Sequence, residues 1–419
     1  MYPFLHRILA ALYTVLPLAA LGWAIVRSRR SHHIEPLVRF FVTCFSGVLL
    51  GTAIVIIHIV LLHGKATAGE VLGSWYFLIG LLCVMGAFRW VVREASWRLF
   101  RVQRTDQGRP IYPGGARMGL ANLMQTALLL GIGLPLVAGT LLVHRVRVNR
   151  GYTPYNLAEC DYENVSFRAT DGVRLAGYWV PADPANGQPT TGRTVLMCCD
   201  ASDTLESQAG LLRVLVSGGY NVLAFDLRGN GESGGQWISF GDVERRDVLG
   251  AVRWVRNNHP QDAEHLMAMG GGAGGAAVLA AATDPGGEGR AIDALAVYDT
   301  YADFRSMAQS VIDDRLMKPL RPWVMHVMMP IVSANAGSDL ARFAPAKLVS
   351  NLWPRPILIV HGRGDAVVPF PQGQDLFRAA TFPKQSLWLP GDRASVYGSR
   401  RGAAVLLEFF DSARPVPAI

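Results

Sequence analysis

Acidic residues are scarce in the first 150 positions of this 419-residue chain. Positions 1–150 hold 16 Lys and Arg against 4 Asp and Glu, a net charge of 16 − 4 = +12, whereas the remainder holds 24 against 28, a net of −4. The formal charge of +8 therefore comes entirely from the N-terminal part. The C-terminal part has no basic patch interleaved with aromatic residues, which argues against nucleic-acid binding.

Cysteine is also rare, with five residues in the chain. Their spacing matches no metal-ligand pattern, and we expect neither a metal nor a cofactor. The adjacent Cys198 and Cys199 could form a strained vicinal disulfide. Two buried thiols on a strand are the favoured interpretation.

Four runs are long and apolar enough to cross a bilayer, for which about 20 mostly apolar residues are needed. They cover residues 8–26, 41–62, 75–92 and 124–143. The first run resembles a signal peptide in position, but it is long and no small-residue cleavage site follows it. Buried helices of a soluble domain are the alternative, which the few charges inside the runs disfavour. The sequence therefore predicts an all-α region of four transmembrane helices over residues 1–150.

The arginines between these runs predict a topology. The loops after the first and third runs are rich in arginine, whereas the loop after the second contains Lys65 as its one cation. The positive-inside rule places the two Arg-rich loops in the cytoplasm. The C-terminal domain, which follows the fourth run, then lies on the other side of the membrane. Arg145, Arg147 and Arg150, directly after the fourth run, argue against this placement. A transporter or channel is disfavoured because the runs carry few polar groups.

Strands and helices alternate along residues 151–419. Short apolar or alternating runs predict strands, and amphipathic stretches between them predict helices. This alternation is typical of a mostly parallel sheet with helices on both faces. The predicted strands cover residues 165–168, 174–180, 194–198, 221–225, 266–269, 294–297, 357–360 and 387–389, and the predicted helices 207–217, 242–257 and 403–410.

The stretch MAMGGGAGGAAVLAA, residues 267–281, has the pattern of a sharp turn from a strand into a helix. Enzymes often keep a nucleophile in such a turn. No serine or cysteine occurs between Phe240 and Arg305, so no shift of register supplies one.

Three further motifs resemble the α/β-hydrolase superfamily. GYNVLAFDLRGNGESGG (219–235) is similar to the family's strand and D-x-R-G-x-G-x-S loop. DVLGAVRWVR (247–256) is similar to the helix before the nucleophile strand, and PRPILIVHGRGDAVVPF (354–370) to the strand and loop that present the catalytic acid. The resemblance is closest to the membrane-anchored branch of serine-hydrolase-like proteins. It implies an α/β-hydrolase fold over residues 151–419.

The resemblance assigns positions to a catalytic triad, of which two are unsuitable. The serine position of G-x-S-x-G is Gly272, which has no side chain to attack a carbonyl. The acid falls on Asp365, although an Asp after a strand equally often caps its own loop. The histidine position falls on about Ala394, in LPGDRASVYG (389–398), and no histidine follows His361.

The other histidines of the C-terminal part do not restore the triad. We interpret His259, His265 and His361 as structural. His326, in the implied cap segment at about residues 299–353, is the one histidine that could approach the site by an unusual route.

The oxyanion hole implied by the resemblance is altered as well. The family commonly has His-Gly where this chain has Cys199-Asp200. An aspartate there would repel the developing negative charge. The backbone N–H of Ala273 could still donate to an oxyanion.

The cap segment is rich in methionine: Met307, Met317, Met325, Met328 and Met329. Methionine suits a lipid- or partner-facing surface, but ordinary packing is the favoured interpretation.

Together these features predict a polytopic membrane protein with a catalytically degenerate hydrolase domain. We expect it to have a binding or accessory role, with membrane lipids, a protein partner in the membrane or an acyl or lipid-like ligand as partners. The alternative is an active esterase or peptidase that uses non-standard residues, such as Asp365 with a water.

Overall fold

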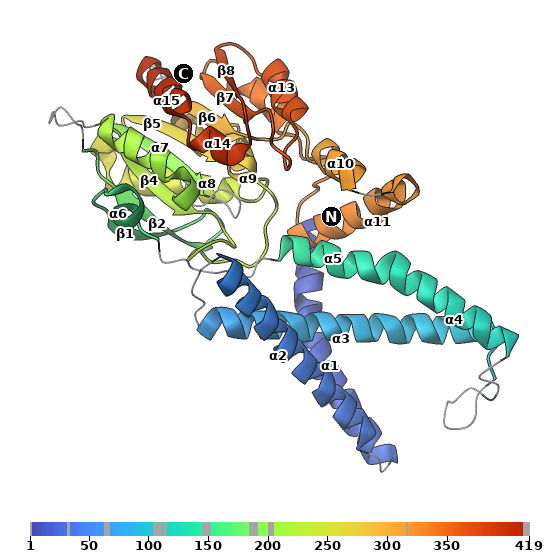
Figure 1. The fold of residues 1–419 in the computed structure, drawn as a ribbon. Coiled ribbons are helices and arrows are strands. Elements are labelled where there is room, and N and C mark those ends of the chain that lie inside the picture. Colours follow the sequence, from blue (N-terminus) through green and yellow to red (C-terminus); the bar gives the residue numbers. More distant parts are fainter. Residues whose placement is uncertain are drawn as a thin grey trace. The chain divides into compact units, whose positions relative to one another are not determined.

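The computed structural model forms two units (Figure 1). One contains residues 1–146 together with 323–337, and the other contains residues 147–322 together with 338–419. The described residues are 2–31, 34–62, 68–103, 111, 115–144, 152–183, 192–199, 205–315 and 317–413.

The N-terminal unit is built from long helices that contain the four predicted apolar runs. These helices are α1 (Tyr2–Ser31), α2 (Glu35–Leu62), α3 (Ala68–Leu99), α4 (Ala116–Leu128) and α5 (Leu134–Val143), with one π-helical stretch, η1 (Leu129–Gly133), joining the last two. In the described part of the chain, two segments are long and apolar enough to cross a membrane, Ser74–Leu99 and Ala116–Val143. Core helices of soluble proteins meet the same criterion, so four membrane spans remain a prediction.

A helix from the middle of the predicted cap segment belongs to this N-terminal unit. In α11 (Arg321–Ala336), Ile331 packs so closely on α5 that a Cβ added at Gly139 would lie 2.9 Å from its Cγ2. His6 of α1 contacts the carbonyl oxygen of Asn335 through Nδ1 at 2.6 Å. The sequence assigned this segment to the C-terminal domain, and the structure differs because α11 packs on α5.

The C-terminal unit contains one sheet of eight strands in the order β1-β2-β4-β3-β5-β6-β7-β8. The first three strands in that order pair antiparallel, and the pairs from β4 onward are parallel. The strands are β1 (Glu163–Arg168), β2 (Arg174–Val180), β3 (Arg193–Cys199), β4 (Asn221–Asp226), β5 (His265–Gly271), β6 (Ile292–Tyr298), β7 (Ile357–Gly362) and β8 (Lys384–Leu389). Each predicted strand lies within one of these, which confirms the mostly parallel sheet.

Helices cover both faces of the sheet (Figure 1). One apolar core includes side chains of α8 and α9, and the other includes side chains of α7 and α15. The helices and helical turns of this unit are α6 (Pro154–Ala158), α7 (Leu205–Ser217), α8 (Arg245–Asn258), η2 (Pro260–Asp262), α9 (Gly272–Ala282), η3 (Glu288–Ala291), α10 (Phe304–Arg315), η4 (Lys318–Leu320), α12 (Pro345–Val349), η5 (Ser350–Leu352), α13 (Phe370–Ala379), α14 (Arg393–Tyr397) and α15 (Arg400–Ser412). This is the α/β-hydrolase architecture.

Candidate functional site

The quoted glycine-rich stretch forms a sharp turn from β5 into α9. Gly272 is the first residue of α9 and has a φ of +51°, a conformation that favours glycine. A Cβ added at Gly270 would lie 2.6 Å from the carbonyl carbon of Gly274, and one at Gly274 would lie 3.0 Å from the oxygen of Cys198. The glycines are therefore needed for the turn and for close packing of α9 on the sheet.

An arginine side chain lies where a nucleophile would project from this turn. A Cβ added at Gly272 would lie 3.0 Å from Nη1 of Arg393 and 3.5 Å from its Cζ. The guanidinium group therefore occupies the space next to the turn. It is always protonated and has no acceptor, so it cannot take a proton from a nucleophile.

Arg393 reaches this position because two loops meet at one end of the sheet. The loop after β8 packs on the loop after β7, and the N–H of Gly364 donates to the oxygen of Gly391 at 2.7 Å. Arg393 begins α14, whose N-cap is Asp392. Its Nε donates to Oδ2 of Asp365 at 3.2 Å. The arginine therefore occupies the place beside the acid that a catalytic histidine would take.

Asp365 both caps its own loop and pairs with Arg393. Its Oδ1 accepts from the N–H groups of Val367 and Val368 at 2.6 and 2.9 Å. Its side chain is 2% exposed and that of Arg393 is 13% exposed. The structure thus shows the loop-capping role of Asp365, whereas its role as a catalytic acid stays a prediction.

A second buried carboxylate, Asp299, lies beside the same arginine. Its Oδ2 is 3.9 Å from Nε of Arg393, and its Oδ1 accepts from the N–H of Gly362 at 2.8 Å. Burial raises the pKa of Asp299 above its ordinary value, and the nearby Asp365 carboxylate acts in the same direction. The residue follows β6 directly and has a φ of +44°.

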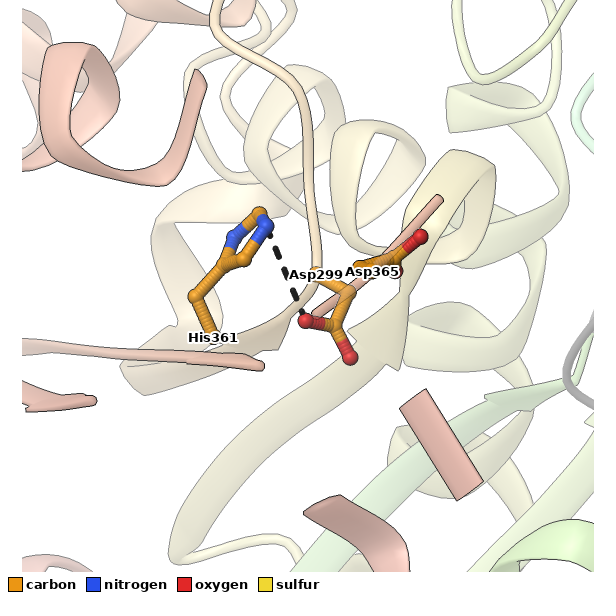
Figure 2. Close-up of side chains that lie close together, drawn as sticks. All are labelled: Asp299, His361 and Asp365. Atoms are coloured by element: carbon orange, nitrogen blue, oxygen red, sulfur yellow. Dashed lines mark ion pairs between the residues drawn. The ribbon is translucent and has the colours of Figure 1, made fainter. Parts of the chain in front are cut away.

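Asp299, Asp365 and His361 bring one potential ligand atom each within 4.8 Å of one another (Figure 2). Nε2 of His361 does not fit a metal ligand, because it lies 2.9 Å from the carbonyl oxygen of Val368 and must carry the proton there. The same Nε2 is 3.7 Å from Oδ1 of Asp299. Arg393 already supplies a cation to both carboxylates.

The loop between β4 and α8 packs on α9. A Cβ added at Gly241 would lie 2.8 Å from the carbonyl oxygen of Ala273. Glu244 holds this part of the loop by accepting from the N–H groups of Ser239 and Gly241 at 2.7 and 2.8 Å.

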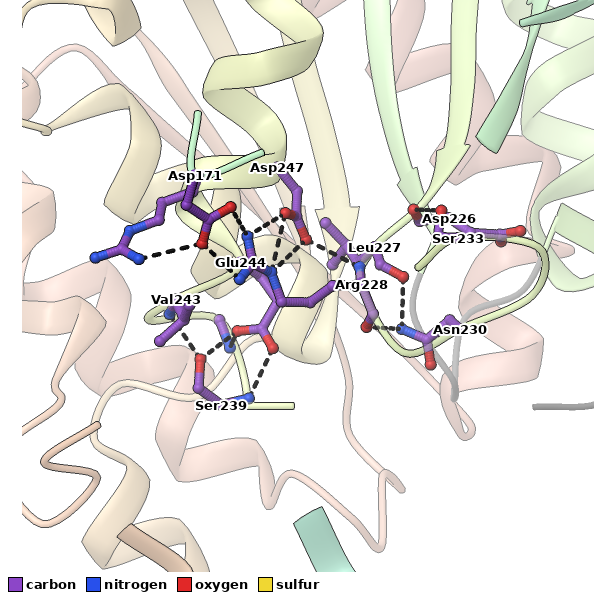
Figure 3. Close-up of polar contacts among 12 residues, drawn as sticks. Asp171, Asp226, Leu227, Arg228, Asn230, Ser233, Ser239, Val243, Glu244 and Asp247 are labelled. Carbon is purple, nitrogen blue, oxygen red and sulfur yellow. Dashed lines mark hydrogen bonds and ion pairs between the residues drawn. The ribbon is translucent and has the colours of Figure 1, made fainter. Parts of the chain in front are cut away.

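Arg228 fixes the start of the same loop (Figure 3). It pairs with both oxygens of Asp171 at 2.9 Å, and its Nε donates to Oδ1 of Asp247 at 3.0 Å. This arginine belongs to the D-x-R-G motif, so the structure assigns that motif a structural role around the turn.

Of the remaining predicted site positions, the structure describes all except Asp200. Cys198 and Cys199 are both buried at the end of β3 and neither is in a disulfide, which confirms the interpretation as two buried thiols. Ala273 follows Gly272 in α9, and Ala394 follows Arg393 in α14. Asp200 lies outside the described residues.

Three of the four histidines after residue 150 lie in the C-terminal unit. His259 stacks on Trp179 with ring centroids 3.9 Å apart, and His265 begins β5. His361 is fully buried at the end of β7. His326 is part of α11 and therefore belongs to the N-terminal unit.

Sequence reasoning missed Arg393 and Asp299. Asp299 could have been found, because it lies shortly after a predicted buried strand, at the edge where Asp365 follows another. Arg393 stands one position before Ala394, and the sequence carried no signal that its side chain would reach the turn.

Comparison with known proteins supports the fold assignment. The sequence profile of the Prolyl oligopeptidase family matches residues 208–388. An esterase of Pyrococcus furiosus, Pf2001, is similar in structure with a TM-score of 0.51 at 19% identity, over 65% of this chain and 99% of the esterase chain. The domain therefore has the α/β-hydrolase fold.

Two curated relatives are similar in sequence. The uncharacterized protein YfhR of Salmonella typhimurium is 27% identical over 62% of this chain and 85% of its own length. The lysophosphatidylserine lipase ABHD12 of Danio rerio is 30% identical over 42% of this chain and 43% of its own length.

Proposed function

We propose that this chain is a membrane-anchored protein whose hydrolase-like domain binds a lipid-like ligand without hydrolysing it. The observation that carries the proposal is the pair Gly272 and Arg393. The turn lacks a nucleophilic side chain, and the guanidinium group beside it occupies the space that a serine and a histidine would need.

The chemistry of acyl transfer supports this conclusion. An acyl-enzyme mechanism requires a side chain that attacks the carbonyl and a base that removes its proton. Gly272 cannot do the first, and the permanently protonated Arg393 cannot do the second. His361, the histidine beside Asp299, is fully buried and hydrogen-bonded to Val368.

The class of ligand is proposed from the membrane-associated part and from one relative. Two helical segments meet the criterion for membrane spans, which would place the domain at a lipid surface. The relative from Danio rerio carries the name lysophosphatidylserine lipase. A lysophospholipid is therefore the first ligand to test.

The decisive experiment follows the fate of that ligand. Purified full-length protein is incubated with lysophosphatidylserine and repurified, and the bound lipid and any free fatty acid are quantified by mass spectrometry. We expect intact lipid to copurify with the protein. Release of fatty acid above a no-protein control, or failure of the lipid to copurify, would contradict the proposal.

Covalent labelling provides an independent test. A fluorophosphonate probe reacts with activated serine nucleophiles, and an active serine hydrolase serves as the positive control. We expect no labelling of the full-length chain. Stoichiometric labelling of the C-terminal unit would show that an unrecognised serine is activated.

The membrane topology belongs to the same proposal. The Arg-rich loops between the apolar helices favour the cytoplasm, which would place the hydrolase-like domain on the non-cytoplasmic side. Fusion of alkaline phosphatase to the C-terminus in a bacterial host tests this placement. We expect phosphatase activity, because the enzyme is active outside the cytoplasm. If the phosphatase fusion is inactive and a cytoplasmic reporter fused at the same site is active, the domain lies in the cytoplasm and the predicted topology is wrong.

A further inference from the structure

A basic cavity lies where α3 ends and α4 begins. Its volume is about 290 Å³. The lining residues are Arg101, Val102, Gln103, Gly115, Ala116, Arg117 and Met118. The cavity lies entirely within the N-terminal unit and is separate from the cluster around Arg393.

The electrostatics of this cavity favour an anion. It is lined by two arginines, and no acidic residue is among the described residues that line it. Across the described part of the chain, neither Arg101 nor Arg117 has an ion pair or a side-chain hydrogen bond. Both residues are exposed.

The backbone adds to the same preference. α4 begins at Ala116 with Gly115 as its N-cap, a residue without a side chain that could accept from the first N–H groups. The first turn of α4 contains no acidic residue. Unpaired N–H groups at a helix start favour negative charge, and here they adjoin the two arginines.

The place of the cavity in the fold identifies the source of the anion. The two segments that meet the membrane-span criterion are Ser74–Leu99 and Ala116–Val143. The end of α3 lies beside the start of α4 (Figure 1). The residues that line the cavity directly follow the first segment or lie at the start of the second. If these segments cross a bilayer, their joined ends lie at the level of the lipid headgroups. A volume of about 290 Å³ is at the lower end for ligand pockets, which suits a headgroup rather than a whole lipid.

We propose that this cavity binds the phosphate of an anionic phospholipid through Arg101 and Arg117. The inference rests on the proposed membrane anchorage, but not on the hydrolase-like domain being inactive. Arginine pairs with phosphate oxygens through two parallel hydrogen bonds, and basic pockets between membrane helices on the cytoplasmic side are typical sites for anionic headgroups. The topology predicted from the sequence places this loop on that side.

The experiment measures lipid binding to the full-length protein by native mass spectrometry from detergent. Phosphatidylglycerol, phosphatidylcholine and inorganic phosphate are titrated separately. The variants are Arg101→Gln, Arg117→Gln and the double variant. Arg98→Gln is the matched control, because Arg98 lies close by in sequence but already pairs with Glu94 at 3.0 Å.

We expect phosphatidylglycerol to bind more tightly than phosphatidylcholine and the double variant to lose about tenfold in affinity, with each single variant in between. Arg98→Gln should bind like the wild type. Equal binding by wild type and double variant, or no preference over phosphatidylcholine, would overturn the proposal. Binding of inorganic phosphate without binding of phosphatidylglycerol would also overturn it, since the source would then be a soluble anion.

Two further measurements keep the outcome interpretable. If the double glutamine variant fails to fold, the variants Arg101→Lys and Arg117→Lys take its place. They keep the positive charge and should still bind phosphatidylglycerol. Extraction of membranes with alkaline carbonate tests anchorage independently. Release of the protein into the soluble fraction would contradict the anchorage, whereas loss of lipid preference with retained anchorage would contradict the headgroup site alone.

Discussion

Nε of Arg393 lies 3.2 Å from Oδ2 of Asp365, and the same guanidinium group borders the position where Gly272 lacks a side chain. One side chain thus pairs with Asp365 and borders the glycine-rich turn. Asp365 has two sets of partners that do not depend on catalysis, namely Arg393 and the backbone of its own loop. The cluster therefore has a stabilising role that can be tested separately from activity.

Loss of the arginine should destabilise the C-terminal unit. Arg393→Met would leave the buried Asp365 and Asp299 without their cation, and we expect a loss of about 3 kcal/mol in unfolding free energy. Urea denaturation in a fixed detergent measures it. The control Arg378→Met removes an exposed pair with Asp375 and should change stability by less than about 1 kcal/mol.

A second variant separates charge from packing. Asp365→Asn keeps an oxygen for the N–H groups of Val367 and Val368 while removing the charge. In combination with Arg393→Met it should recover part of the lost stability. If the double variant is as unstable as the sum of the two single variants, the ion pair is not the source of the effect.

A serine at position 272 and a histidine at position 393 test whether the turn and Asp365 can still support a reactive nucleophile. Gly272 keeps a φ of +51°, and Asp365 remains at the place of the acid. We expect Gly272→Ser/Arg393→His to gain slow fluorophosphonate labelling, because serine and histidine would then adjoin the acid. Gly272→Ser alone should stay unlabelled, since Arg393 cannot accept a proton. Labelling of the single variant at the rate of the double one would show that Arg393 does not block the site.

The sequence predicted the sheet better than it predicted the site. Short apolar strands such as Ile357–Gly362 are typical of a buried parallel sheet, so the local sequence pattern located them. The absence of a nucleophilic side chain at Gly272 could also be predicted from the sequence, because it depends on residue type alone. The role of Arg393 depends on two loops meeting in space, which no local pattern encodes. The same holds for α11, since helical periodicity does not reveal which neighbour a helix packs against.

Replacing Arg228 with lysine should be costly although the charge is kept. Arg228 holds Asp171 and Asp247 with a planar fork that an ammonium group cannot reproduce. We expect Arg228→Lys to lower the unfolding free energy by about 2 kcal/mol. Arg246→Lys is the matched control, because Arg246 pairs with the same Asp171 but is 46% exposed. Equal stability of the two variants would contradict the structural role assigned to Arg228.

The pH dependence of stability should carry a contribution from Asp226, the last residue of β4. Burial raises the pKa of this carboxyl from 3.8 to about 6, so the folded protein holds the proton more tightly than the unfolded chain. The stabilising contribution of this group is therefore complete below pH 3.8 and is lost as the pH rises through about 6. Asp226→Asn cannot ionise and should reduce the fall in melting temperature between pH 4.5 and pH 7. Parallel melting curves for wild type and variant over that window would show that Asp226 does not titrate as the structure indicates.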